Sequence, residues 1–358
     1  MKVAEIGEFG LIDRWMKMLE SRDPRIIVGA GDDAAVLQPS PGRVLVATCD
    51  MMVEGVHFLA SLSKPRQVGL KAMAMNLSDL AAMNASPLAA LISVALTPDL
   101  DVAFVDELYA GLSFMADRFG CPVAGGDTVR SMSSLVIDVF VAGEADRERM
   151  TLRSGASPGD IVLVTGHLGE SAAGLDLLLA GGGSPPPGRG RRARPDCPAG
   201  VSPGAAAEVI RAHLTPVPRL AEARAISEAG GATAAIDISD GLANEVNHIA
   251  RMSGVGIVVD AGSVPLSPAT AEVARALGKD PLHYALFGGE DYELCLTAHP
   301  STVDSIVRAV RDFTGTPITP IGRVIAKKGC WLSRDGRHER LPAGAWDHFR
   351  KGNAHDEV

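Results

Sequence analysis

The chain has 358 residues, 46% of them hydrophobic and 22% charged, which predicts two globular domains and excludes a wholly disordered chain. Its 34 Lys and Arg residues against 43 Asp and Glu residues give a formal net charge of −9, which disfavours nucleic acids and anionic membranes as partners. The longest apolar run covers residues 88–96 and is too short to cross a bilayer, and acidic residues interrupt the N-terminal stretch where a signal peptide would be apolar. We therefore expect a cytoplasmic protein with no nucleic-acid and no membrane partner.

The cysteines support the same location. They are widely spaced and include no CxxC pair: Cys49, Cys121, Cys197, Cys295 and Cys330. This pattern argues against a disulfide framework and against a structural zinc site. A reducing compartment is therefore expected.

Helix-period and strand-period segments alternate along the first part of the chain. The pattern predicts helices near 8–19, 65–83 and 102–119, and strands near 44–49, 89–96 and 135–142. Charged and turn residues then cluster near 147–158. We therefore expect an N-terminal α/β domain over residues 1–147.

The second part alternates again and predicts a C-terminal α/β domain over residues 148–358. Strands are expected near 161–165, 232–239, 256–259 and 292–297, and helices near 170–179, 205–213, 218–229, 242–252 and 301–312. The segment 181–204 contains 7 Gly, 6 Pro and 4 Arg residues, a composition that neither buries surface nor holds a helix. We expect a disordered surface insertion there. Its arginines are interpreted as part of a solvated loop, because no aromatic residue is interleaved for base stacking.

Aspartates recur beside glycines and near the expected strand ends. The segments are GAGDDAAV (29–36), TCDMMVEGVHF (48–58), NLSDLAAM (76–83), GGDT (125–128), DISDGL (237–242) and GGEDYEL (288–294). In open α/β folds ligands bind at strand ends, so carboxylates there indicate a binding site. Two carboxylates about 4 Å apart repel by about 4 kcal/mol at an effective dielectric constant of about 20, so a cluster of them needs divalent cations or raised pKa values. Oxygen ligands without His or Cys pairs favour Mg²⁺, Ca²⁺ or Mn²⁺ over zinc.

Individual positions in these segments have structural alternatives. Asp50 is expected to end its strand, and Asp237 and Ser239 to share one face of a strand. Asp240 is expected at a helix N-terminus, where an ordinary helix cap is the alternative. A purely structural role does not explain Asp79 well, because it shares one face of an otherwise apolar helix with Asn76, and burying two polar groups there without partners would be costly.

Nucleotide-binding motifs of the common kinds are missing from the sequence. There is no GxxxxGK[ST], no GxGxxG that opens a helix after a strand, and no HRD or DFG set. An ATP-binding site must then use another phosphate cradle. The pairs Gly125-Gly126 and Gly288-Gly289 are the candidates, because glycine lets main-chain N–H groups approach phosphate oxygens.

Taken in order, the acidic motifs resemble those of the thiamine-monophosphate kinase family, in the superfamily typified by aminoimidazole ribonucleotide synthetase. The matching segments are GDDAAV, DMMVEGVHF, NLSDLAAM, GGDT, RSGASPGD, DISDGL and GGEDYEL, and the similarity runs from about Gly7 to Phe349 with a break at 181–204. The resemblance implies a two-domain α/β (α+β) architecture, with an N-terminal domain that binds ATP and Mg²⁺ and whose sheet pairs with that of a second subunit in a homodimer. It also implies an enzyme that phosphorylates thiamine monophosphate to thiamine diphosphate, with ATP as co-substrate and several Mg²⁺ ions.

The resemblance also implies roles for single residues. The implied magnesium ligands are Asp33, Thr48, Cys49, Asp50, Asp79, Asp127, Asp237 and Asp240. The implied ATP contacts are Gly126, Asp127, Arg153, Ser239 and Tyr109, and the implied thiamine monophosphate contacts are His57, Glu290 and Trp346. Asp32 and Asp291 are interpreted as turn residues or as supports for the ligands. No catalytic residue is implied beyond the metal ligands, because an ionised phosphate acceptor needs no general base.

The sequence departs from the family pattern at two positions. Cys49 stands where the family usually has Ser or Thr, and its carbonyl is the expected ligand because a thiol binds Mg²⁺ poorly. Asn84 replaces the usual Gly, which Asn can mimic in a left-handed conformation.

Two other functions fit parts of the pattern. One is an ATP-dependent enzyme of the same superfamily with a different acceptor, such as a purine-pathway synthetase or selenophosphate synthetase. The other is a non-catalytic protein that binds calcium or a nucleotide. The segments VEGVHF and GGEDYEL fit the thiamine enzyme better than either.

Overall fold

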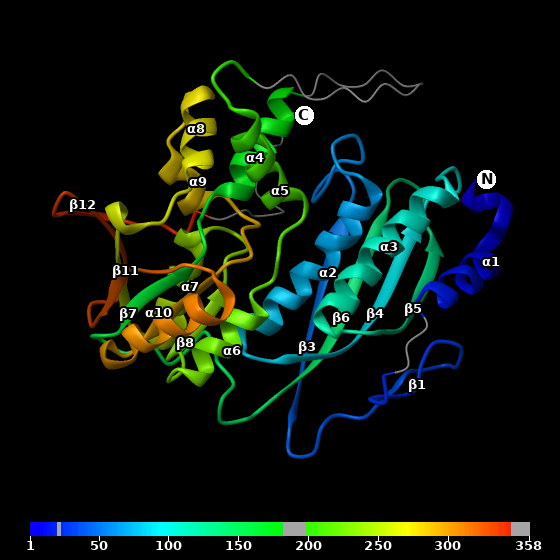
Figure 1. The fold of residues 1–358 in the computed structure, drawn as a ribbon, viewed down its shortest axis with the longest axis horizontal. Coiled ribbons are helices and arrows are strands. Elements are labelled where there is room, and N and C mark those ends of the chain that lie inside the picture. The colour runs from blue at the N-terminus through cyan, green and yellow to red at the C-terminus, as the bar shows by residue number, and fades with distance from the viewer. Residues whose placement is uncertain (20–22, 182–197, 345–358) are drawn as a thin grey trace. The chain divides into compact units, whose positions relative to one another are not determined.

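The structure is a computed structural model, and it describes residues 1–19, 23–181 and 198–344. The chain divides into two compact units, the first holding residues 1–150 and 214–220 of the described part and the second holding the remainder. Both units combine helices with sheets (Figure 1), which confirms the predicted α/β class. Within the described ranges, no helix has the length and apolar character needed to span a membrane.

The first unit contains a four-stranded sheet in the order β3-β6-β4-β5. Its strands are β3 (Val44–Val53), β4 (Ser86–Leu96), β5 (Val123–Arg130) and β6 (Val136–Ala145). The pairs β3/β6 and β4/β6 are antiparallel, whereas β4 and β5 are parallel and are connected through helix α3 (Val102–Phe119). Strands β1 (Ile26–Val28) and β2 (Val36–Leu37) form a separate antiparallel pair.

Helices cover one face of this sheet. Helix α2 (Pro65–Ala82) packs against β3 and β6, α3 packs against α2, and α1 (Val3–Met18) packs against α3 (Figure 1). The backbones of α2 and α3 are in close contact, because a Cβ on Gly69 would lie 2.1 Å from the carbonyl oxygen of Leu108 and a Cβ on Gly111 would lie 2.1 Å from that of Arg66. These two glycines therefore fix how closely α2 and α3 pack.

The other face of the sheet, here called the open face, carries apolar side chains that stay exposed. Along β3 and β5 the side chains of Leu45, Met51 and Val129 are 63%, 52% and 50% exposed. The residues that alternate with them, such as Met52 and Val46, are buried beneath α2. The first unit thus has one covered face and one open apolar face.

The second unit is built on a seven-stranded sheet in the order β13-β12-β9-β11-β7-β10-β8. Strands β9 and β12 pair in parallel, and the other neighbours pair antiparallel. The strands are β7 (Ile161–Thr165), β8 (Ala234–Asp237), β9 (Gly256–Asp260), β10 (Leu294–Ala298), β11 (Ile318–Ile325), β12 (Gly329–Arg334) and β13 (Arg337–Arg340). Its helices are α4 (Glu170–Gly181), α5 (Pro203–Leu214), α6 (Leu220–Glu228), α7 (Leu242–Ser253), α8 (Pro268–Ala276), α9 (Pro281–Phe287) and α10 (Pro300–Thr314), with a short 3₁₀ turn at Ala261–Ser263.

The core of the second unit lies between the sheet and helix α7. Buried apolar side chains of β7, β8, β9 and β12 meet those of α7, among them Val164, Ile236, Val259 and Ile249. A smaller apolar cluster joins α4, α5, α8 and α9. The predicted insertion 181–204 lies between α4 and α5: its first residue ends α4, its last two begin α5, and residues 182–197 lie outside the described part.

Two sequence-based boundaries in the first unit were wrong. Strand β3 does not end at Cys49 or Asp50 but continues to Val53, because β6 pairs with it along its whole length. Asp127 does not follow a strand but lies inside β5, which pairs with β4 from Val123 to Arg130. Glycine pairs are weak strand formers, so the sequence alone did not indicate this strand.

In the second unit the end of one strand was wrong, and so was the alternative of Asp240 as a helix cap, although the start of the helix was predicted correctly. Strand β8 ends at Asp237, so Ser239 lies beyond it and the two do not share a strand face. Helix α7 begins at Leu242 with Gly241 as its N-cap, so Asp240 is not the helix cap. Gly241 has a φ of 102°, a conformation that glycine adopts without strain.

Candidate active site

The first group of predicted site residues connects β3 to α2. The hydroxyl of Thr48 donates a hydrogen bond to the carboxylate of Asp79. The main-chain N–H of Asp50 donates to Oδ1 of Asn76 at 3.0 Å, and Nδ2 of Asn76 donates to the carbonyl of Ala72 at 3.3 Å. Asn76 and Asp79, the polar pair on α2, therefore face β3. They contact two of the predicted ligands there, Asp50 and Thr48.

Asp127 belongs to the other edge of the same sheet. In the register of the sheet, Asp127 lies beside Ser93 of β4, and Ser93 lies beside Asp138 of β6. Asp50 of β3 lies one residue away from this line of neighbours. Strands β3 and β5 are separated by three strand spacings of ~4.8 Å, or about 14 Å. Asp127 is exposed, and its Oδ1 accepts the main-chain N–H of Thr128 at 2.8 Å. Within one chain, the sheet does not bring Asp127 together with Asp50.

Cys49 lies on the open face of β3, the face opposite to α2. Its thiol donates a hydrogen bond to Oδ1 of Asp138 at 3.1 Å. This hydrogen bond, helped by burial, raises the pKa of Cys49 to about 11, so the thiol stays protonated at neutral pH. The arrangement favours the carbonyl over the sulfur as a ligand to a hard cation. Asp138 was missed by the sequence analysis, although a lone acid within the apolar run VIDVFV could have pointed to it.

His57 follows β3 in a tight turn. The main-chain N–H of Val53 donates to Nδ1 of His57 at 3.1 Å, and the N–H of His57 donates to the carbonyl of Val53 at 2.9 Å. Because Nδ1 accepts a hydrogen bond, a neutral His57 carries its proton on Nε2. Nε2 is therefore the atom of His57 that can donate to an anion.

The loop that carries Asp33 is a turn stabilised by its neighbour. The N–H of Asp33 donates to Oδ1 of Asp32 at 2.9 Å, so Asp32 holds the turn and both carboxylates are exposed. Tyr109 is placed differently from the other predicted ATP contacts, because it is only 4% exposed. Its ring stacks on Trp15 of α1 with centroids 4.3 Å apart, and burial raises its pKa.

In the second unit, two of the predicted motifs lie side by side. The N–H of Glu290 donates to the carbonyl of Ser239 at 2.7 Å, and the N–H of Tyr292 donates to the carbonyl of Ile238 at 2.9 Å. Glu290 and Tyr292 have φ values of 65° and 50°, in the left-handed region. The structure thus hydrogen-bonds Glu290, a predicted contact of thiamine monophosphate, to Ser239, a predicted contact of ATP.

A buried acidic group surrounds Asp240. Oε1 of Glu245 accepts the main-chain N–H of Asp240 at 3.1 Å, and Nδ2 of Asn244 donates to Oδ2 of Asp240 at 3.3 Å. Burial, with smaller contributions from Asp237 and Asp240, raises the pKa of Glu245 to about 8, and the charge of Arg153 opposes this. Glu245 was missed by the sequence analysis, although it stands five residues after Asp240, in the first turn of the helix that follows the segment DISDGL.

Asp291 is a structural support in this unit. Its carboxylate is buried and accepts the main-chain N–H groups of Gly169 at 2.7 Å and of Ser171 at 3.2 Å, at the start of α4. Burial raises its pKa. Asp291 thus holds the start of α4, and its role as a support for the site stays a prediction. Trp346 lies outside the described residues.

The donor chemistry of these groups fits magnesium. They offer carboxylate, hydroxyl and carbonyl oxygens, and the repulsion among Asp237, Asp240 and Glu245 is the kind that a cation relieves. Among the residues that the structure describes, no three His, Cys, Asp or Glu side chains form a ready-made metal cage. Magnesium commonly uses one or two carboxylates together with substrate phosphates and water. Small groups such as Thr48 with Asp79 therefore suit it.

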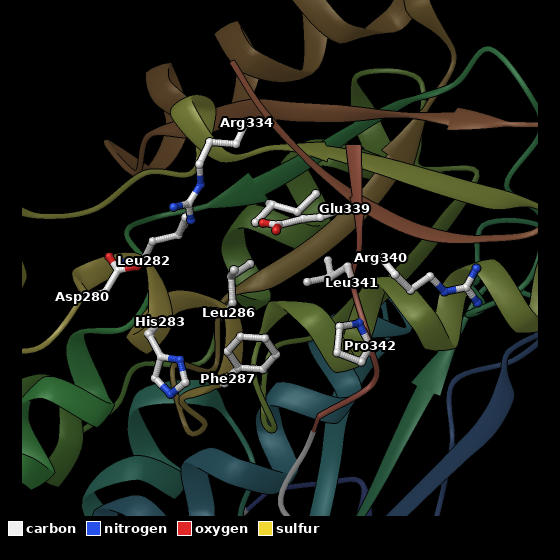
Figure 2. Close-up of a pocket in the computed structure, with 11 residues that line it drawn as sticks. Asp280, Leu282, His283, Leu286, Phe287, Arg334, Glu339, Arg340, Leu341 and Pro342 are labelled. Atoms are coloured by element: carbon white, nitrogen blue, oxygen red, sulfur yellow. The ribbon is translucent and has the colours of Figure 1, made fainter. Parts of the chain in front are cut away.

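A cavity of about 220 Å³ lies elsewhere on the second unit, between α9 and the β12–β13 hairpin (Figure 2). Its walls are largely apolar, with charged residues at the rim: Asp280, Leu282, His283, Leu286, Phe287, Leu332, Arg334, Glu339, Arg340, Leu341 and Pro342. None of the predicted site residues lines it. Phe287 directly precedes the segment GGEDYEL.

Known proteins match this chain over nearly its whole length. The domain AIR synthase related protein, N-terminal domain, matches residues 31–145, and the corresponding C-terminal domain matches residues 157–332. The thiamine-monophosphate kinase of Aquifex aeolicus (strain VF5) is 38% identical over 349 residues, which are 98% of this chain and 100% of that protein. That of Bacillus subtilis (strain 168) is 34% identical over 341 residues, which are 93% of this chain and 98% of that protein.

Solved structures agree with the sequence matches. The thiamine-monophosphate kinase from Stenotrophomonas maltophilia K279a has a TM-score of 0.77 and 34% identity, covering 92% of this chain and 96% of that one. AaThiL complexed with AMPPCP and TMP has a TM-score of 0.71 and 35% identity, covering 98% of this chain and 99% of that one. These matches confirm the resemblance seen in the acidic motifs. The chain belongs to the thiamine-monophosphate kinase family, within the AIR synthase related proteins.

Proposed function

We propose that the protein transfers the γ-phosphoryl group of ATP to thiamine monophosphate, giving ADP and thiamine diphosphate, the last step in making that cofactor. The observation that carries the proposal is the similarity, over 98% of the chain, to a structure complexed with AMPPCP and TMP. The hydrogen bond between Glu290 and Ser239 supports the proposal, because Glu290 is a predicted contact of the acceptor substrate and Ser239 is a predicted contact of the nucleotide.

Mg²⁺ is the proposed metal, and bound at these groups it would neutralise phosphate charge and the charge that develops during transfer. Its proposed ligands are those implied by the motifs: Asp33, Thr48, Cys49 through its carbonyl, Asp50, Asp79, Asp127, Asp237 and Asp240. Several structural contacts prepare them for this role. Asn76 fixes the backbone of Asp50, Thr48 fixes the carboxylate of Asp79, and Asn244 fixes that of Asp240.

The proposed reaction is a direct in-line transfer. An oxygen of the acceptor phosphate forms the new bond to the γ-phosphorus while the bond from that phosphorus to the β–γ bridging oxygen breaks, and ADP leaves. The attacking oxygen is already ionised at neutral pH, so no residue has to remove a proton. The protein's part is to position the two substrates.

Positioning is assigned to two sets of residues. Gly126, Asp127, Arg153 and Ser239, with Tyr109, are proposed to contact ATP. His57, Glu290 and Trp346 are proposed to contact thiamine monophosphate. Nε2 of His57 is a donor suited to a phosphate oxygen, because Nδ1 is already engaged with Val53.

One assay tests the proposal against its rivals. ATP consumption by the purified protein with Mg²⁺ should depend on thiamine monophosphate and should yield thiamine diphosphate. Consumption that depends on a different acceptor would indicate another enzyme of the superfamily. Nucleotide binding with no turnover on any acceptor would indicate a non-catalytic protein.

We further propose a homodimer formed through the sheet of the first unit. Two features support it: the apolar side chains of the open face, such as Met51 and Leu45, and the edge strands β3 and β5, which have no further strand beside them in the described part of the chain. A cytoplasmic location is proposed from the reduced state of the cysteines that the structure describes. The domain boundary at residues 147/148 is likewise a proposal.

A further inference from the structure

Three side chains of the second unit meet at one imidazole nitrogen. His213 lies in the last turn of α5 and is buried. Its Nδ1 lies 3.1 Å from Oγ of Ser171, at the start of α4, and 3.4 Å from Oε2 of Glu290. His213 and Ser171 both lie outside the acidic motifs, so the sequence analysis gave neither of them a role.

The contacts indicate where the proton lies. A carboxylate oxygen only accepts hydrogen bonds, so a bare lone pair on Nδ1 facing Glu290 would be repelled. A hydrogen on Nδ1 of His213 is therefore favoured, because it faces Oε2 of Glu290 at 3.4 Å, and in that tautomer Nδ1 donates to Oγ of Ser171.

The backbone around Glu290 is held by different contacts. Its N–H is bonded to Ser239. Ser171 is held in turn by Asp291, whose buried carboxylate accepts the main-chain N–H of Ser171. The main chain of Glu290 is thus fixed by one set of bonds, and its carboxylate is oriented by His213.

We propose that His213 is a positioning residue that holds the Glu290 carboxylate in the orientation in which it contacts the acceptor substrate. The proposal rests on the proposed function, in which Glu290 binds thiamine monophosphate. The side chain of Glu290 is 24% exposed and that of His213 is 6% exposed, so the carboxylate reaches the ligand and the imidazole acts through it. Holding the carboxylate in place before binding lowers the entropy lost when the acceptor binds.

The test uses two substitutions and a matched control. His213→Leu removes the Nδ1 donor and fills the same space with an apolar side chain of similar bulk. His213→Asn places an amide nitrogen near the position of Nδ1. His283→Leu removes an exposed imidazole from α9 and serves as the control.

The expected result is a change specific to the acceptor. In His213→Leu the KM for thiamine monophosphate should rise about tenfold or more, the effect of losing one hydrogen bond to a charged group, while the KM for ATP stays at its wild-type value. His213→Asn should recover most of the loss, and His283→Leu should behave as wild type. In a Glu290→Gln background, His213→Leu should add little, because the two residues act as one unit.

Three results would overturn the proposal. They are an unchanged KM for thiamine monophosphate in His213→Leu, a parallel rise in the KM for ATP, and an additive effect in the Glu290→Gln background. If His213→Leu does not fold, His213→Phe replaces it, because it also removes the donor and keeps a flat ring, and an unchanged acceptor KM there would count equally against the proposal. A wild-type protein that does not phosphorylate thiamine monophosphate would defeat the proposed function as well, whereas an active wild type with an unaffected variant would defeat the positioning role alone.

Discussion

The main-chain N–H of Glu290 donates a hydrogen bond to the carbonyl oxygen of Ser239 at 2.7 Å. The two loops can approach this closely because Gly289 has no side chain: a Cβ there would lie 2.5 Å from the same carbonyl oxygen. The glycine pair predicted as a phosphate cradle therefore also sets the spacing between two functional loops.

Gly289→Ala should consequently impair the reaction more than the fold. The added methyl group must push the loops apart, and a displacement of about 1 Å in a site that works by positioning can cost about 100-fold in rate. Steady-state kinetics should show a large fall in kcat/KM with a nearly unchanged melting temperature. Gly204→Ala is the matched control, because a Cβ there meets no atom within 4 Å. Equal kinetics in both variants would contradict this account.

Asp79→Asn and Asp127→Asn should each reduce kcat by about 100-fold or more, because a carboxylate that binds Mg²⁺ contributes several kcal/mol to transition-state stabilisation. Circular dichroism should show an intact fold. Asp99→Asn, an exposed carboxylate in the loop after β4, is the control. Turnover close to that of the wild type in both variants would end the metal-ligand proposal for these residues.

Asn76→Leu should destabilise the first unit. It removes the acceptor on α2 of the main-chain N–H of Asp50, and losing a part-buried hydrogen bond of this kind costs about 0.5–1.5 kcal/mol. Urea unfolding measures this loss directly. Asn76→Asp keeps an acceptor oxygen at the position and should retain more of the hydrogen bond than Asn76→Leu. A leucine variant as stable as the wild type would show that the contact contributes little.

Arg25→Met should lower stability more at neutral pH than in acid. Hydrogen bonding to Arg25 holds the pKa of Asp23 below its usual value, so this contribution is present above the unfolded pKa near ~3.9 and is lost as the pH falls through the folded pKa. Arg25 also donates to the carbonyl groups of Pro87 and Gly120 at 3.0 and 3.1 Å, and that part of the loss does not depend on pH.

Chemical unfolding of the wild type and of Arg25→Met between about pH 7 and about pH 3, values above and below the ordinary pKa of an aspartate, measures the effect. The difference in unfolding free energy should shrink as the pH falls. A difference that is constant or grows in acid would mean that the ion pair with Asp23 is not its source.

Met51→Glu should weaken the proposed dimer. It places a charge on the open face, on the edge strand β3 where Met51 is 52% exposed, and burying an unpaired charge in an interface is costly. Size-exclusion chromatography with light scattering should then show monomers. Phe9→Glu, at another exposed apolar position on α1, should leave the dimer intact. A wild type that is monomeric at micromolar concentration would refute the dimer itself.

The long, strongly periodic elements could be predicted from the sequence. Helix α3 and strand β7 have the predicted bounds, because their apolar periods are uninterrupted. Strand β5 was missed because Gly125 and Gly126 do not favour strands, and its pairing with β4 is a long-range contact that supplies what local preference lacks. The C-terminal strands β11 to β13 and the helices α8 and α9 were also missed. Polar, Gly and Pro residues interrupt their apolar patterns, so local periodicity does not distinguish them from loops.

The chemistry of the candidate site was easier to read than its arrangement. Motifs identify the acidic residues, because carboxylates beside glycines are conspicuous in an apolar background. They do not show which side chains support them. Asn244, Glu245 and His213 act through contacts between separate elements, and no local spacing encodes such contacts.

Helix α2 has two roles at different points along its length. Gly69 fixes it against α3, and Asp79 lies ten residues later, about 15 Å along the axis. A bulkier residue at Gly69 or Gly111 should push α2 away from α3, and because a regular helix moves largely as a rigid rod, the displacement should also reach the carboxylate at the far end. Random mutagenesis scored only by loss of catalysis should therefore recover these two glycines, and a map of activity alone would mistake an interhelical spacer for part of the reaction centre.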